Sequence, residues 1–253
     1  MAALLGTAKE VTAFHEPKPQ MVGDYVRMVN DLDYDSTLAA RSLKGDAIAK
    51  TLRPGRVYCE TSHMFIKTYF DVVLARFGSS ITVLHLQREM ASVLKSFVEL
   101  GYFSERNLAW RDWMTQPGAA TAALECLAPE AEMDQHDRCI AYLLDIEARA
   151  VRFRSRYPET LLVTVRLDEL NSISRVAELF STLRITPTAA TETVCGRPIN
   201  QRAERKAMIQ NPASLSDCRS RIASYVARAR KQGIGLPHEL VERLERESCD
   251  IRS

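Results

Sequence analysis

The chain has 253 residues, which is the size of one large domain or two small ones. Hydrophobic residues make up 46% and charged residues 26%, shares that are typical of a globular protein and exclude a disordered or fibrous chain. The 34 lysines and arginines and 32 acidic residues leave a formal charge of +2. Any site for an anion must therefore depend on a few placed basic side chains rather than on a broad positive field.

Apolar runs in this sequence are too short to span a membrane, and the first residues lack the basic and apolar regions of a secretory signal. The six cysteines are scattered, with no Cys-x-x-Cys pair and no zinc-finger spacing. Such cysteines are typical of reduced thiols. We therefore expect a cytoplasmic protein that binds neither a membrane nor a metal.

Hydrophobic periodicity and turn-forming residues divide the chain into alternating strands and helices. In chain order, the pattern predicts strands over 11–14 and 56–60, a helix over 65–76, a strand over 80–86, helices over 89–100 and 135–156, a strand over 160–166, helices over 172–183 (with Asn171 as N-cap) and 215–232, and a short helix after Pro237. The last three strands are apolar enough to be buried parallel strands, so the alternation predicts an α/β layered sheet.

The chain is short enough, and its pattern continuous enough, that we expect one α/β domain over 1–253. We expect a helical insert at about 101–135 and a C-terminal helical region at about 207–253. The basic stripe at 219–231 is interpreted as a solvated helix face, and we expect no binding of nucleic acid.

Polar side chains follow two of the predicted strands. Glu60 and His63 lie at the end of strand 56–60, and Arg88 follows strand 80–86. If both strands belong to one sheet, these side chains meet at the rim where open α/β sheets bind ligands. A cation and hydroxyls near a helix N-terminus suit an anionic ligand.

The segment LHLQREMASVLKSF resembles the 3′-phosphate-binding segment of the PAPS-dependent sulfotransferases. In that family a strand delivers an Arg, and a Ser eight residues later on the following helix shares the 3′-phosphate of the donor. Arg88 and Ser96 hold these two positions. The pairing is physically reasonable, because the guanidinium group offers a fork of donors to phosphate oxygens.

Two further stretches extend the resemblance over roughly residues 11 to 206. VYCETSH matches the strand that ends in the family's general base, which is a His or a Glu, so the resemblance implies a catalytic role for His63 or Glu60. CGRPIN falls where the family has a basic loop over the 3′-phosphate. It implies donor contacts for Arg197, Asn200 and Arg202.

The family's Gly/Ser/Thr-rich phosphosulfate loop is absent from this sequence. In that fold the strand before the loop is central, and its loss leaves unpaired backbone groups on two neighbouring strands. The resemblance thus implies an N-terminally truncated form of a P-loop-related three-layer sandwich with a mostly parallel central sheet. Three alternatives stay open. The sheet closes in a different way, or the natural chain starts further upstream, or the fold is kept while the sulfuryl-transfer activity is lost.

If intact, a protein of this family transfers a sulfuryl group from PAPS to a hydroxyl or amine of a small-molecule or carbohydrate acceptor, without a metal. The alternative is a catalytically inactive binding or scaffold protein, so whether the chain is an enzyme stays open. Whether it forms a homodimer stays open as well. A nucleotide kinase-like protein is a third hypothesis. It needs the same absent loop and a Mg²⁺-binding Asp, for which Asp168 is the candidate.

Each candidate residue also has a plain structural alternative. Arg88 would form a surface ion pair with Glu89, and Glu60 would orient His63 or bind a cation. The segment His15-Glu16-Pro17, at the end of strand 11–14, would cap the strand rather than face a substrate. Lys67 is expected to be a solvated charge on its helix.

Overall fold

The computed structural model describes residues 1–34, 38–197 and 212–249. The chain contains two compact units. The first unit contains the described residues of Met1–Met21, Ser36–Gln87 and Glu159–Gln201. The second contains those of Val22–Asp35, Arg88–Pro158 and Arg202–Ser253.

All four predicted strands lie in the first unit, at β1 (Val11–His15), β2 (Val57–Thr61), β3 (Thr82–Gln87) and β4 (Leu161–Arg166). Each boundary falls within two residues of its predicted position. The helical elements of this unit are α1 (Ala2–Leu5), α3 (Leu38–Thr51), η1 (Phe65–Tyr69), α4 (Phe70–Phe77), η2 (Gly78–Ser80), η5 (Asp168–Asn171), α7 (Ile173–Thr182) and α8 (Ala189–Val194).

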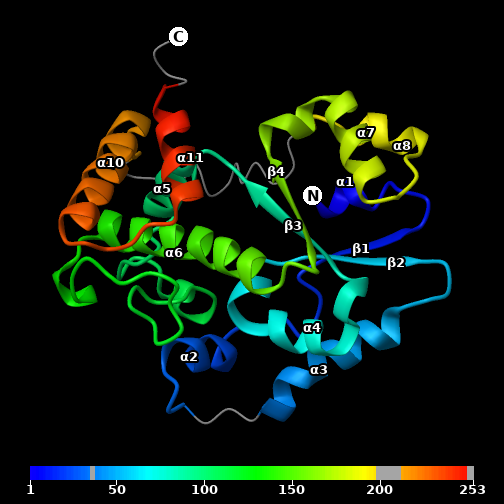
Figure 1. The fold of residues 1–253 in the computed structure, drawn as a ribbon, viewed down its shortest axis with the longest axis horizontal. Helices are drawn as coiled ribbons and strands as arrows, with labels where there is room; N and C mark the ends of the chain where they lie inside the picture. The colour runs from blue at the N-terminus through cyan, green and yellow to red at the C-terminus, as the bar shows by residue number, and fades with distance from the viewer. Residues whose placement is uncertain (35–37, 198–211, 250–253) are drawn as a thin grey trace. The chain divides into compact units, whose positions relative to one another are not determined.

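The strands form two separate parallel pairs rather than one central sheet. Among the described residues, β1 pairs with β2 and β3 pairs with β4, both in parallel (Figure 1). The prediction of an α/β class with parallel strands is confirmed. The expectation that β2 and β3 belong to one sheet is wrong for the described residues, because each uses only one edge for its single partner.

The strands are also less buried than predicted. None of the six residues of β3 is fully buried, and Leu86 is 41% exposed. Val57 on β2 and Leu161 on β4 are 45% and 50% exposed. A strand with one hydrogen-bonded neighbour is an edge strand, so its apolar residues are not enclosed from both sides.

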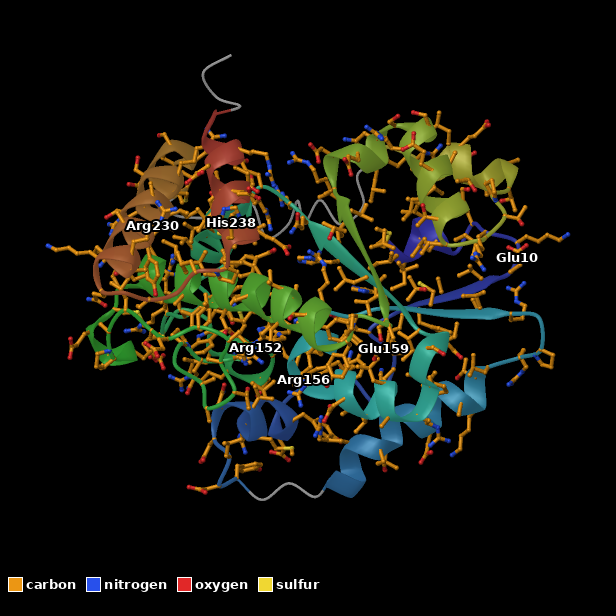
Figure 2. All side chains as sticks on the ribbon, in the orientation of Figure 1. Glu10, Arg152, Arg156, Glu159, Arg230 and His238 are labelled. Atoms are coloured by element: carbon orange, nitrogen blue, oxygen red, sulfur yellow. The ribbon has the colours of Figure 1, made fainter. Side chains whose placement is uncertain are left out.

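The first unit has an apolar core beside its strands. α1 and α7 contribute Leu5, Val176 and Phe180, which are at most 2% exposed, and Val165 comes from β4. Glu10, labelled in Figure 2, fixes the start of β1, because its carboxylate accepts hydrogen bonds from the backbone and hydroxyl of Thr186 at 2.9 and 2.7 Å.

Two details of the predicted helices in this unit were wrong. The helix predicted over 65–76 begins as the π-helix η1 and continues as α4, a change that the apolar spacing does not reveal. Asn171 is not an N-cap, because it ends the 3₁₀ turn η5 and α7 starts only after Ser172.

The second unit is helical in its described residues. Its elements are α2 (Asp24–Asn30), α5 (Met90–Glu99), η3 (Leu108–Asp112), η4 (Glu130–Glu132), α6 (Gln135–Arg156), α10 (Leu215–Lys231) and α11 (His238–Cys249). α5, α6, α10 and α11 pack around buried residues such as Leu94, Ile140 and Ala229.

The predicted helices of this unit are present, and α6 has the predicted bounds. The insert at 101–135 differs from the expectation of a helical segment, since before α6 it holds only the short 3₁₀ helices η3 and η4. Across the described ranges, none of the helices combines the length and apolar character required to cross a bilayer.

Candidate functional site

Charged and hydroxyl side chains gather where β1 and β2 end. His15 and Thr61, the last residues of the two strands, are register partners, and the chain continues to Glu16 and His63. α3 contributes Lys44 and η1 contributes Lys67. We call the group formed by Glu16, Lys44, Tyr58, Glu60, His63, Lys67 and Tyr69 the β1–β2 cluster.

Glu60 is the buried anion of this cluster. Its Oε1 lies 2.7 Å from Nζ of Lys44, and the two side chains are only 8% and 1% exposed. The hydroxyls of Tyr58 and Tyr69 donate to the carboxylate at 2.7 and 2.9 Å. Burial and the Glu60 charge raise the pKa of both tyrosines, so both remain neutral donors.

Lys44 holds the loop after β1 as well as Glu60. Its ammonium donates to the carbonyls of Pro17 and Pro19 at 3.2 and 3.0 Å. With Glu60 as its third acceptor, all three ammonium protons have partners. These contacts favour the structural alternative for Glu60: it binds a cation, and that cation is the Lys44 side chain.

His63 links a lysine to a second carboxylate. Its Nδ1 lies 3.0 Å from Nζ of Lys67, and its Nε2 lies 3.2 Å from Oε1 of Glu16. An ammonium group only donates, so Nδ1 accepts from Lys67 and the ring proton sits on Nε2, toward Glu16. Loss of solvent around the ring, the Lys67 charge and His15 lower the pKa of His63, which keeps the ring neutral.

Lys67 is not the solvated charge that the sequence predicted, because it is only 3% exposed. The side chains of His63 and Glu16 are 41% and 29% exposed, so the Lys67–His63–Glu16 chain runs from a buried ammonium to groups that solvent reaches. Such a chain positions a carboxylate and an imidazole for proton transfer.

Arg88 directly follows β3 and belongs to the second unit. The Arg88 side chain is exposed, and it makes no hydrogen bond or ion pair with the residues that the structure describes. Glu89, its expected partner, pairs instead with Arg219 at 2.7 Å and accepts from the Ser92 hydroxyl. The described residues thus show no direct Arg88–Glu89 ion pair. Burial opposes the ionisation of Glu89, but hydrogen bonds from Ser92 and Arg219 lower its pKa, and the Arg88 charge contributes to a smaller extent.

Ser96 lies half-buried on α5, almost two helical turns after its first residue. Arg88 and Ser96 belong to the second unit, and Glu60 and His63 to the first. The prediction of a common rim required β2 and β3 to lie in one sheet. The described strands do not form such a sheet.

The remaining predicted donor contacts fall near or beyond the end of the described segment. Arg197 is exposed after α8, and its backbone N–H donates to the carbonyl of Val194 at 3.1 Å. Asn200 and Arg202 lie outside the described residues.

The kinase hypothesis finds no support at Asp168. Its carboxylate is 2.9 Å from the guanidinium of Arg166, and hydrogen bonds from Arg166 lower its pKa. No three or more His, Cys, Asp or Glu side chains in the described ranges are arranged to hold a metal ion.

Lys44, Tyr58 and Tyr69 are the members of the cluster that sequence reasoning did not single out. No helix was predicted over 38–51, although the segment is rich in alanine, and Lys44 is one of four charged residues in it. An alanine-rich composition signals a helix, but it does not distinguish the one charge that turns inward.

Comparison with known proteins adds no relative: no protein-family model, no curated protein and no solved structure matches this chain.

Proposed function

We propose that this chain is a sulfotransferase-like protein of the P-loop-related, three-layer architecture. In this proposal it transfers a sulfuryl group from PAPS to a hydroxyl or amine of a small-molecule or carbohydrate acceptor. The observation that carries the proposal is the exposed Arg88 guanidinium, which follows the parallel strand β3 and makes no hydrogen bond or ion pair with the described residues. A free arginine at the carboxyl end of a parallel strand suits a phosphate group.

Strand pairing supports the proposed architecture. Loss of the central strand of a parallel sheet would leave separate parallel pairs, and β1–β2 and β3–β4 are two such pairs. The half-exposed apolar residues on β2 and β3 agree with strands that each keep a free edge.

The proposed transfer moves one group and one proton. The acceptor oxygen or nitrogen attacks sulfur, the bond from sulfur to the donor phosphate oxygen breaks, and PAP leaves. The acceptor's proton passes to a general base, and the candidate in the first unit is the carboxylate of Glu16, which His63 orients through its Nε2 proton. Arg88 and Ser96, which both belong to the second unit, hold the 3′-phosphate in this proposal.

A second candidate is a sulfotransferase-fold protein that binds PAP without transfer. It is favoured by the commitment of Glu60 to Lys44 and two tyrosines. Incubation with radiolabelled PAPS and simple phenols or amines separates the two candidates. Binding with sulfated product supports the enzyme, and binding without product supports the second candidate.

Calorimetric titration with PAP tests the proposed ligand. We expect binding below about 1 mM, and we expect Arg88→Ala to weaken it by about 10- to 100-fold, since a charge-assisted contact is lost. AMP lacks the 3′-phosphate, so Arg88→Ala should leave AMP binding within about twofold.

The matched control is Arg230→Ala. Arg230 lies on α10 (Figure 2), and its side chain is 52% exposed in a surface pair with Glu245. Absence of PAP binding by the unaltered chain, or equal affinities for Arg88→Ala and Arg230→Ala, removes the basis of the proposal.

A further inference from the structure

The backbone on both sides of Glu89 is held by one ion pair on α11. Nη2 of Arg243 donates to the carbonyl oxygen of Arg88 at 2.7 Å. The N–H of Met90, the first residue of α5, donates to Oε2 of Glu247 at 2.9 Å. Nε of Arg243 lies 2.8 Å from Oε1 of Glu247, so both contacts come from the same pair.

This ion pair is itself anchored in the second unit. Arg243 is 8% exposed, and its Nη1 lies 2.6 Å from Oε2 of Glu147 on α6. Arg243 donates hydrogen bonds to Glu247 and to the Arg88 carbonyl and forms an ion pair with Glu147, so its buried side chain is held between the two helices. α6 and α11 together therefore fix the position of the Arg88 carbonyl.

The side chain of Glu89 is fixed as well, by Arg219 from α10 and by the hydroxyl of Ser92. The turn from Arg88 to Met90 thus has its carbonyl, its amide and its acidic side chain engaged. The guanidinium of Arg88 is the charged group of this turn that is exposed and without a partner in the described residues.

We propose that Arg243 and Glu247 are positioning residues that hold Arg88 ready for a phosphate group of the ligand. This inference rests on the proposed function, in which Arg88 binds the 3′-phosphate of PAPS or PAP. A ligand-binding cation on a preordered backbone loses less conformational entropy on binding than one on a mobile turn. Removing the support should weaken phosphate binding even though neither Arg243 nor Glu247 touches the ligand.

A double-mutant cycle on PAP affinity tests this assignment. Glu247→Ala should weaken PAP binding by about tenfold, and Glu247→Gln by less, because its amide oxygen still accepts the N–H of Met90. In the Arg88→Ala background, Glu247→Ala should change PAP affinity by less than about twofold, since a positioning residue acts through the group it positions. The control is Glu245→Ala. Glu245 lies on α11, as Glu247 does, and its exposed side chain pairs with Arg230 of α10.

Amide hydrogen exchange in the ligand-free protein supplies a readout independent of PAP. Glu247→Ala should accelerate exchange at Met90, whereas Arg88→Ala and Glu245→Ala should not. Losses that add in the double mutant, or unchanged exchange at Met90, overturn the positioning role while leaving the proposed function in place. If the unaltered chain binds no PAP, the proposed function and this inference are both overturned.

Discussion

At the scale of single residues, the two carboxylates of the β1–β2 cluster have different environments. Glu60 is enclosed with a buried cation and two hydroxyl donors, whereas Glu16 is partly exposed beside a neutral imidazole. The sequence singled out Glu60 and His63 because they lie at the end of a predicted strand, and both side chains belong to the β1–β2 cluster. The sequence did not reveal that Lys44 neutralises Glu60 or that Lys67 contacts His63.

Removing Lys44 should destabilise the protein strongly. Lys44→Met leaves the Glu60 carboxylate buried without its cation, which we expect to lower the free energy of unfolding by about 3–5 kcal/mol at neutral pH. Urea denaturation measures this change. Lys50→Met, at an exposed lysine of the same helix, should cost less than about 0.5 kcal/mol. Equal stability of the two variants would mean that the Lys44–Glu60 pair contributes nothing.

The lowered pKa of His63 predicts a pH dependence of stability. Below about pH 6.5 the unfolded chain takes up a proton on this ring that the folded chain does not. The contribution of neutral His63 is therefore present above that pH and is lost as the pH falls. Between about pH 7.5 and about pH 5.5, a range that spans the ordinary pKa of histidine, the free energy of unfolding of the unaltered chain should fall by more than that of His63→Gln.

Urea denaturation at several pH values checks this difference. The control is His238→Gln, at a side chain that is 86% exposed at the start of α11 (Figure 2), and its curve should run parallel to that of the unaltered chain. A curve for His63→Gln that also runs parallel contradicts the assignment of a neutral, contact-bound ring.

At the scale of elements, local chemistry determined the helix ends that the sequence predicted well. α6 begins after Asp134, whose carboxylate accepts from the N–H of Asp137 at 2.8 Å, and it ends before Pro158. The π-helical start of the element at 65–77 was not predicted, because a π turn keeps the same apolar residues and differs only in its backbone.

The cap of α6 allows a prediction that separates a hydrogen bond from a charge. Asp134→Ala should lower the free energy of unfolding by about 1 kcal/mol, since the cap is lost. Asp134→Asn keeps an acceptor and loses only the exposed pair with Arg221, so it should cost less than about 0.5 kcal/mol. Urea denaturation of both variants, with Glu132→Ala as the surface control, gives the comparison. Equal losses in both would assign the stabilisation to the charge instead.

The basic stripe on α10 shows what an element cannot reveal by itself. Its arginines at 219, 221, 228 and 230 pair with Glu89, Asp134, Asp137 and Glu245. The sequence predicted a solvated helix face and did not identify these partners, which come from the N-cap of α5, from α11, and from the start of α6 and its cap. Partners so distant in the sequence are brought to α10 only by the packing of the second unit.

At the scale of the whole molecule, each of the two compact units is assembled from three separate stretches of the chain. The α/β class and the parallel direction of the strands followed from the alternation of strands and helices, because parallel neighbours need a crossover between them. The division into two units did not follow, since it depends on which distant segments bury surface together.

The sequence by itself determined where most strands and helices lie, because periodicity, caps and proline stops act over a few residues. It also pointed to Glu60, His63 and Arg88, since each follows a strand. Only the tertiary structure decided that β2 and β3 pair with different strands, that Lys44 and Lys67 turn inward, and that Arg243 and Glu247 hold the Arg88 turn. Those outcomes depend on burial and hydrogen bonds between segments far apart in the chain, where the free energy belongs to the packed unit and not to any local pattern.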